Sequence, residues 1–247
     1  MALLVAFKFL TVLPIPLRRD LPDKAMGRAA AYYPLVGAAI GLALVGADLA
    51  LARALPVGLR SALVLALWVG LTGALHLDGF LDCCDALFAP RSPQERLEIL
   101  RDPHVGAFAV VGGVLLLLVK YAALASLQGP GRLGALGVVP ALGRWAMVYA
   151  LVRYPYGRTG GGLGGLVKGA AGRREALVAS AVALAAALVG WRAAGLAALP
   201  ATWVLTALLA RWITGRIGGL TGDAYGAINE LVEAAWLVAA VAAGVRA

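Results

Sequence analysis

The chain has 247 residues, of which 62% are hydrophobic and 14% are charged, and its formal net charge is +9. A soluble domain is about half apolar and about a quarter charged, so this composition excludes an ordinary soluble domain and predicts an all-α polytopic membrane protein. The basic residues lie in loops between apolar segments. Membrane topology and anionic lipid therefore explain the positive charge, and we expect no nucleic-acid partner.

Residues 1–30 are predicted to form an N-terminal segment at the membrane interface. Their first apolar run is interrupted by Lys8 and is shorter than the about 20 residues that a transmembrane helix needs. No basic stretch precedes the run, which argues against a cleaved signal peptide. An interfacial amphipathic helix is the favoured interpretation.

The remainder is predicted to form a helical bundle of about seven transmembrane helices, within a single membrane domain that covers residues 1–247. Windows of about 20 residues, the length that crosses a bilayer, identify the segments. They lie near residues 31–52, 61–77, 106–127, 133–152, 176–191, 197–214 and 231–245.

Lysine and arginine are concentrated in alternate connecting segments. The basic segments are 1–30, 78–105, 153–175 and 215–230, and the connections between them are short and poor in basic residues. The positive-inside rule places the basic segments, and with them the N-terminus, in the cytoplasm. Nearly all acidic residues lie on the same side, so we expect the active-site loops there.

The stretch HLDGFLDCCDALF (76–88) gathers acids where an apolar segment ends. In a helix Asp78, Asp82 and Asp85 follow an i, i+4, i+7 pattern and share one face, where their carboxylates repel one another. A magnesium ion, which prefers oxygen ligands, would remove that repulsion. The alternative is a solvated acidic cap. His76 is either a metal ligand or a neutral, hydrogen-bonded side chain.

The stretch ERLEILRDPHVGAF (95–108) is a second charged region. It is either an exposed helix that ends before Pro103, or a second rim of the same site. In the second case Asp102 would be a further metal ligand or a base.

The stretch YPYGRTGGGLGGLVKG (154–169) is rich in glycine and is flanked by Arg153 and contains Arg158. Such a loop can present backbone N–H groups to an anion, although a flexible linker is the alternative.

Ionisable residues also fall inside the apolar segments. Glu233 and Lys120 do so, as does Arg144, which is too central in its segment to reach the membrane surface. Such groups are usually paired, buried and functional. Taken together, acids for magnesium and bases for phosphate at one membrane face predict transfer from a phosphoanhydride.

Five stretches together resemble the family of cobalamin-5′-phosphate synthase, also called adenosylcobinamide-GDP ribazoletransferase. They are FLTVLPIP (9–16), HLDGFLDCCDALF (76–88), RLEILRDPHVGAFAV (96–110), YPYGR with GLG (154–164) and GGLTGDAYGAINELVE (218–233). The family pattern around the acids is close to HLDGLADTADGL, so here Cys83 and Cys84 replace Thr-Ala and Ala86 replaces the last Gly. The second block usually has Lys-Asp-Ser, where this chain has Arg-Asp-Pro at 101–103.

The resemblance implies a magnesium-dependent transferase in the bacterial cytoplasmic membrane. It would join adenosylcobinamide-GDP to α-ribazole or its 5′-phosphate and release GMP, with lipid as a further partner; a homo-oligomer is compatible with the sequence. Asp78, Asp82 and Asp85 would hold magnesium, and Asp82, Asp85 or Asp102 would accept the proton of the attacking hydroxyl. The implied substrate- and phosphate-binding residues are His76, Arg101, Arg144, Arg153, Arg158, Asp223, Asn229 and Glu230.

Two other functions fit part of the sequence. A CDP-alcohol phosphotransferase or an intramembrane prenyltransferase would also use magnesium, but Asp78-Gly79 lacks the Ala-Arg of the first family and a second Asp-rich motif is missing. A transporter would allow intramembrane charges, but we find no internal repeat.

Overall fold

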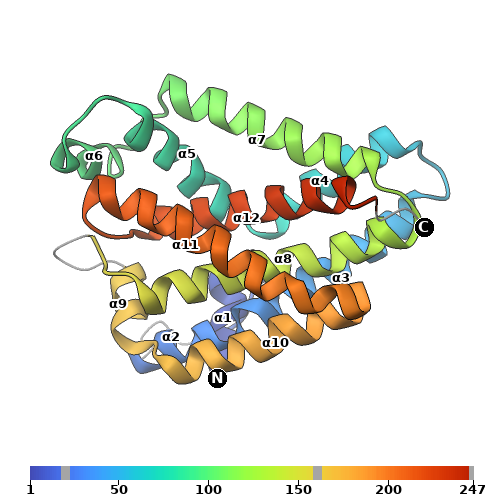
Figure 1. The fold of residues 1–247 in the computed structure, drawn as a ribbon, viewed down its shortest axis with the longest axis horizontal. Coiled ribbons are helices and arrows are strands. Elements are labelled where there is room, and N and C mark those ends of the chain that lie inside the picture. The colour runs from blue at the N-terminus through green and yellow to red at the C-terminus, as the bar shows by residue number, and fades with distance from the viewer. Residues whose placement is uncertain (18–22, 158–162, 245–247) are drawn as a thin grey trace.

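The computed structural model describes residues 1–17, 23–157 and 163–244, and within these ranges the chain is helical without a β-strand. The predicted all-α class is therefore confirmed (Figure 1). The helices are α1 (Ala2–Leu10), α2 (Asp23–Ala29), η1 (Ala30–Tyr32), α3 (Tyr33–Leu51), α4 (Val57–Leu71), α5 (Leu75–Phe88), α6 (Pro93–Ile99), α7 (Ala107–Ser126), α8 (Gly129–Arg153), α9 (Leu163–Ala170), α10 (Arg173–Trp191), η2 (Arg192–Ala197), α11 (Ala198–Ile217) and α12 (Gly222–Ala242).

Helix α8 is the centre of the bundle. It is buried along most of its length and packs against α3, α10, α11 and α12. Small residues make the closest of these contacts: a Cβ atom at Gly37 of α3 would lie 2.3 Å from the carbonyl oxygen of Pro140, and one at Gly41 would lie 2.6 Å from that of Gly137. Lipid supplies no hydrophobic force between helices, so this close backbone packing is what holds them together.

Five helical segments of the described chain are long and apolar enough to cross a membrane, or six if α4 and α5 count as one broken span. One of the five is the continuous stretch Arg173–Ile217. In Figure 1 this stretch doubles back at η2, so that α10 and α11 run beside each other. The multi-pass membrane character is thus supported, while the number seven remains a prediction.

The second predicted span differs from the structure at its end. Helix α4 stops at Leu71, and α5 starts at Leu75 after a bend of 90°. Gly73 and Ala74 have φ angles of 59° and 58°, a left-handed conformation that ends one helix and redirects the chain. The hydropathy pattern predicted one span over 61–77, because the residues at the bend are themselves apolar or small and do not interrupt the pattern.

The connections that carry the predicted site lie at one end of the molecule. In Figure 1, α6, α9 and the connection from α11 to α12 are at the left, opposite the C-terminus and η2. The predicted loops 78–105, 153–175 and 215–230 include these elements, and α5 and α6 make the first of them mostly helical. Which side faces the cytoplasm remains a prediction.

Large apolar side chains also cover the outside of the bundle. Phe108, Val111, Leu115 and Leu118 of α7 are each at least half exposed, as expected of a surface that lipid covers. Helix α1 buries Val5, Ala6 and Leu10 against the bundle and contacts α2 and α3.

Candidate active site

Helix α5 carries the three aspartates on one face, as the sequence predicts. Asp78 lies in its first turn and is exposed, and Asp82 and Asp85 are half-buried. The first turn of a helix is a favourable place for a carboxylate, because the helix dipole is positive there.

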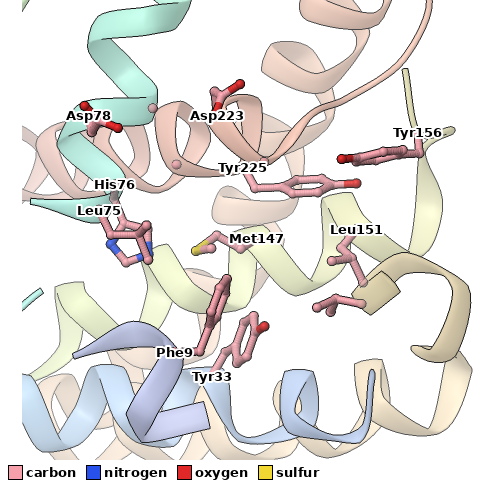
Figure 2. A pocket seen from close by; sticks show the side chains of 14 residues that line it. Phe9, Tyr33, Leu75, His76, Asp78, Met147, Leu151, Tyr156, Asp223 and Tyr225 are labelled. Carbon is pink, nitrogen blue, oxygen red and sulfur yellow. The ribbon is translucent and has the colours of Figure 1, made fainter. Parts of the chain in front are cut away.

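Two glycines let α5 and α12 approach within backbone contact. A Cβ atom at Gly79 would lie 2.8 Å from the Cα atom of Asp223, and one at Gly226 would lie 3.0 Å from the carbonyl oxygen of His76. This contact packs Gly79, the residue after Asp78, against the backbone of Asp223. Figure 2 shows both carboxylates at the same edge of a cavity.

The cavity has a volume of about 260 Å³. Figure 2 shows Phe9 and Tyr33 on the side opposite the acids, with Met147 between, and Tyr156 and Tyr225 along a third side. Its described lining contains two carboxylates and no lysine or arginine. The complete lining is Phe9, Tyr33, Leu75, His76, Asp78, Gly79, Met147, Leu151, Tyr156, Val167, Gly222, Asp223, Tyr225 and Gly226.

A backbone bridge brings the start of the glycine-rich stretch to this cavity. The amide of Gly157 donates to the carbonyl of Leu220 at 2.9 Å, and the amide of Leu220 donates to the carbonyl of Pro155 at 2.8 Å. A Cβ atom at Gly219 would lie 2.6 Å from the nitrogen of Gly157, so the two segments of backbone meet without side chains between them. Tyr156 thereby reaches the cavity.

A buried network of charges lies next to the cavity. Lys120 of α7 pairs with Glu230 and, at 2.6 Å, with Glu233 of α12, and Arg144 of α8 pairs with the other oxygen of Glu233. Nη2 of Arg144 also lies 3.3 Å from Nδ1 of His76. Arg144, Glu230 and Asn229, all predicted to bind substrate, are thus buried behind the cavity and are not among its lining residues.

Asp85 is bound to backbone rather than to the cavity. Its carboxylate accepts hydrogen bonds from the amides of Gly106 at 2.7 Å and Ala109 at 2.9 Å, the first amides of α7. Arg96 donates to the carbonyls of Ala86 and Leu87 at the end of α5. Asp85 thus caps the start of α7, and Arg96 caps the end of α5. Both are common structural roles for such side chains.

Arg101 and Asp102 are exposed and lie outside the cavity lining. The carboxylate of Asp102 accepts hydrogen bonds from the amide of His104 at 3.0 Å and interacts with its ring Nδ1 at 2.5 Å. These bonds lower the pKa of Asp102, so the carboxylate is ionised over a wider pH range and is a weaker base.

The remaining predicted bases also lie elsewhere. Arg153 lines a separate cavity of about 270 Å³ together with Arg211, Trp203 and Tyr149, and Arg158 falls outside the described residues. Lys168 of the glycine-rich stretch donates to the carbonyls of Leu151, Val152 and Tyr154 at the end of α8. Burial lowers the pKa of the Lys168 ammonium.

Sequence reasoning missed the aromatic part of the cavity. Tyr156 and Tyr225 lie within stretches that were singled out for their glycines and acids, so their position beside those residues was the available signal. Phe9, Tyr33 and Met147 come from three other helices. Phe9 begins the FLTVLPIP stretch of the family pattern, whereas no local pattern in the sequence distinguishes Tyr33 and Met147 from core residues.

Among the described residues, no three His, Cys, Asp or Glu side chains come together as a preformed metal cluster. What the site offers is a pair of carboxylates at the cavity edge. That donor set fits magnesium, which is commonly bound by one or two carboxylates, with water and substrate phosphates completing its coordination.

The sequence comparisons agree with the stretches identified above. The model of the cobalamin-5-phosphate synthase family matches residues 2–241. An adenosylcobinamide-GDP ribazoletransferase of Pseudomonas paraeruginosa is 44% identical over 239 residues, 96% of each chain. One of Desulforamulus reducens is 38% identical over 240 residues, 96% of this chain and 94% of the relative. No solved structure matches. The chain belongs to the cobalamin-5-phosphate synthase family.

Proposed function

We propose that this protein is an adenosylcobinamide-GDP ribazoletransferase of the bacterial cytoplasmic membrane, with its site on the cytoplasmic side. A ribose hydroxyl of α-ribazole, or of its 5′-phosphate, attacks the phosphorus next to the corrinoid, and the bond from that phosphorus to GMP breaks. The products are adenosylcobalamin, or its phosphate, and GMP. The names of relatives that match nearly the whole chain support this activity.

The observation that carries the proposal is the composition of the cavity wall. Asp78 and Asp223 line one cavity whose described lining contains no lysine or arginine. Carboxylates alone repel a phosphate, so a phosphate ester can bind there only with a cation. Asp78 and Asp223 are the residues that would hold magnesium, and Asp82 lies one turn further along the same face of α5. When bound, magnesium neutralises charge on the reacting phosphoryl group.

The size of the cavity assigns it to the smaller substrate. Pockets for drug-sized ligands are typically about 300–1,000 Å³, and this one has about 260 Å³. The aromatic side chains of Phe9, Tyr33 and Tyr225 suit the flat base of α-ribazole. The much larger corrinoid stays outside, where its phosphates meet Asp78 and Asp223 at the edge.

The chain's own carboxylates provide the proton acceptor. Asp78 lines the cavity and Asp82 lies one turn further along the same face of α5, whereas Asp102 lies outside the cavity lining and is occupied by His104. We therefore assign the attacking hydroxyl's proton to Asp82 or Asp78. Asp85 caps α7 and has a structural role in this proposal.

The experiment is turnover by the detergent-purified protein with adenosylcobinamide-GDP, α-ribazole 5′-phosphate and Mg²⁺. We expect GMP release that stops when a chelator is added and returns with excess Mg²⁺. CDP-alcohols and prenyl diphosphates should give no product. Absence of GMP together with corrinoid uptake into proteoliposomes would instead identify a transporter.

A further inference from the structure

The contacts of Arg144 determine the protonation of His76. Nη1 of Arg144 pairs with Glu233 and lies 3.3 Å from the carbonyl of Pro140, while Nη2 lies 3.3 Å from Nδ1 of His76. Glu233 is itself held from its other side by Lys120 at 2.6 Å. The guanidinium is therefore fixed between Glu233 and the imidazole.

An arginine side chain can only donate hydrogen bonds, so Nδ1 of His76 must be the acceptor. An accepting Nδ1 carries no proton. The ring is then neutral, and its single N–H is on Nε2. The two ring nitrogens point in different directions, so the contact between Nδ1 and Arg144 turns Nε2 away from the arginine.

The Nε2 atom of His76 is buried and has no hydrogen-bond partner among the described residues. His76 is among the residues that line the cavity, and Figure 2 shows its ring beside Leu75 and close to Met147. The hydroxyl of Tyr225, on the same cavity, is also buried without a partner. A buried donor left unpaired is costly, which indicates that a ligand in the cavity supplies the acceptor.

We propose that the Glu233–Arg144 pair holds His76 as its Nε2-protonated neutral tautomer, and that this N–H donates to an oxygen of the transferred phosphoryl group at the cavity. His76 is then a substrate-contacting residue, and Arg144 and Glu233 are positioning residues. The identity of the substrate rests on the proposed function, whereas the tautomer does not.

The tautomer can be measured directly, because the chain contains only two histidines. The full-length protein is labelled with ¹⁵N-histidine, and its ring nitrogens are recorded by NMR in detergent micelles, with His76→Asn used to assign the signals. We expect one neutral form of His76, with a protonated Nε2 and an unprotonated Nδ1. A protonated Nδ1 overturns the proposal, whether or not the protein turns over substrate.

A charge-balanced double variant tests the positioning role. Arg144→Met with Glu233→Gln removes one positive and one negative charge and leaves the Lys120–Glu230 pair. The matched control is Arg132→Met with Asp48→Asn, which removes another buried pair, between α8 and α3, whose members do not line the cavity. Thermal unfolding of both variants confirms that they are folded.

We expect the Arg144/Glu233 variant to show a mixture of His76 tautomers. Its kcat for GMP release should fall about 100-fold, as when a preorganised donor is lost, with KM for α-ribazole 5′-phosphate changed less than about threefold. The control should keep the wild-type tautomer and kcat. A wild-type tautomer and kcat in the Arg144/Glu233 variant, or the same loss in the control, overturns the proposal. If wild-type protein releases no GMP while His76 shows the expected tautomer, the proposed function fails and the positioning of His76 stands.

Discussion

Helix α8 carries two buried arginines with different surroundings. All three nitrogens of Arg132 donate: Nε and Nη2 to Asp48 at 2.9 and 2.6 Å, and Nη1 to Ser61 at 2.9 Å and to the carbonyl of Leu124. Around Arg144, its own Nε, Nε2 of His76 and both side-chain atoms of Asn229 have no partner among the described residues.

This difference separates a structural ion pair from one that serves a site. Buried polar groups are almost always hydrogen-bonded, so several unpaired groups in one place indicate a ligand or water that completes them. The group around Arg144 borders the cavity through His76, whereas Arg132 and Asp48 are not part of its lining. We therefore expect that loss of Arg132 mainly lowers stability and that loss of Arg144 mainly lowers turnover.

The largest effect is expected at the carboxylates of the site. Asp78→Asn, Asp82→Asn and Asp223→Asn should each lower GMP release by about 10³-fold or more, because each removes charge that would hold magnesium or accept a proton. The midpoint of thermal unfolding of Asp78→Asn should change little, since Asp78 is exposed. Near-normal turnover of all three variants would remove the basis of the proposed site.

Arg132→Met should have its main effect on stability. Removing Arg132 leaves the buried Asp48 with Arg60 alone, whose Nε lies 3.2 Å away, so we expect a loss of at most about 3–5 kcal/mol, the cost of breaking a buried ion pair. Thermal or denaturant unfolding in detergent measures the loss. The folded fraction should keep its kcat, and a large fall in kcat at unchanged stability would show that the comparison between the two arginines is wrong.

Gly79→Ala should lower both the stability of the protein and its turnover. The new Cβ atom would lie 2.8 Å from the backbone of Asp223 and would push α5 away from α12, at a cost of about 1–3 kcal/mol. Because the same displacement separates Asp78 from Asp223, kcat should fall as well. Gly70→Ala is the control: a Cβ atom there meets nothing within 4 Å, so this variant should be neutral or slightly stabilising.

Asp85→Asn should have the smallest effect. An amide oxygen can still accept one of the two hydrogen bonds from Gly106 and Ala109, so we expect a loss of about 1 kcal/mol and turnover within a few-fold of wild type. GMP release, measured as for Asp78→Asn, tests this prediction. A loss of turnover as large as that of Asp78→Asn would support the original sequence-based assignment of Asp85 as a metal ligand.

The sequence was most informative where neighbouring residues act together. Spacing alone predicted that Asp78, Asp82 and Asp85 share a helical face, and hydropathy and charge predicted which loops gather at one end. It was least informative about partners distant in sequence. Lys120 and Glu233 could be recognised as buried charges, but their pairing, and that of Arg132 with Asp48, depends on how whole helices pack.

Motifs also did not reveal how each residue is used. The stretch around Arg101 and Asp102 belongs to the family pattern, yet in the structure it lies outside the cavity, and nearby Arg96 and Asp85 join it to the helix ends. Conversely, Tyr33 and Met147 line the cavity without any distinctive neighbours in the sequence. Successive side chains point about 100° apart around a helix. An error of one residue in the assumed register of a helix therefore changes which side chains are expected to face the cavity.

The glycine contact between α5 and α12 has a consequence for how this cavity can change. The wall that carries the acids is fixed by backbone atoms, because a Cβ atom at Gly79 would lie 2.8 Å from the backbone of Asp223. The facing wall consists of exchangeable side chains, among them Phe9, Tyr33 and Met147, and volume-conserving swaps of this kind usually cost less than about 1.5 kcal/mol. Substrate preference can therefore be redesigned on one wall while the reacting groups keep their spacing.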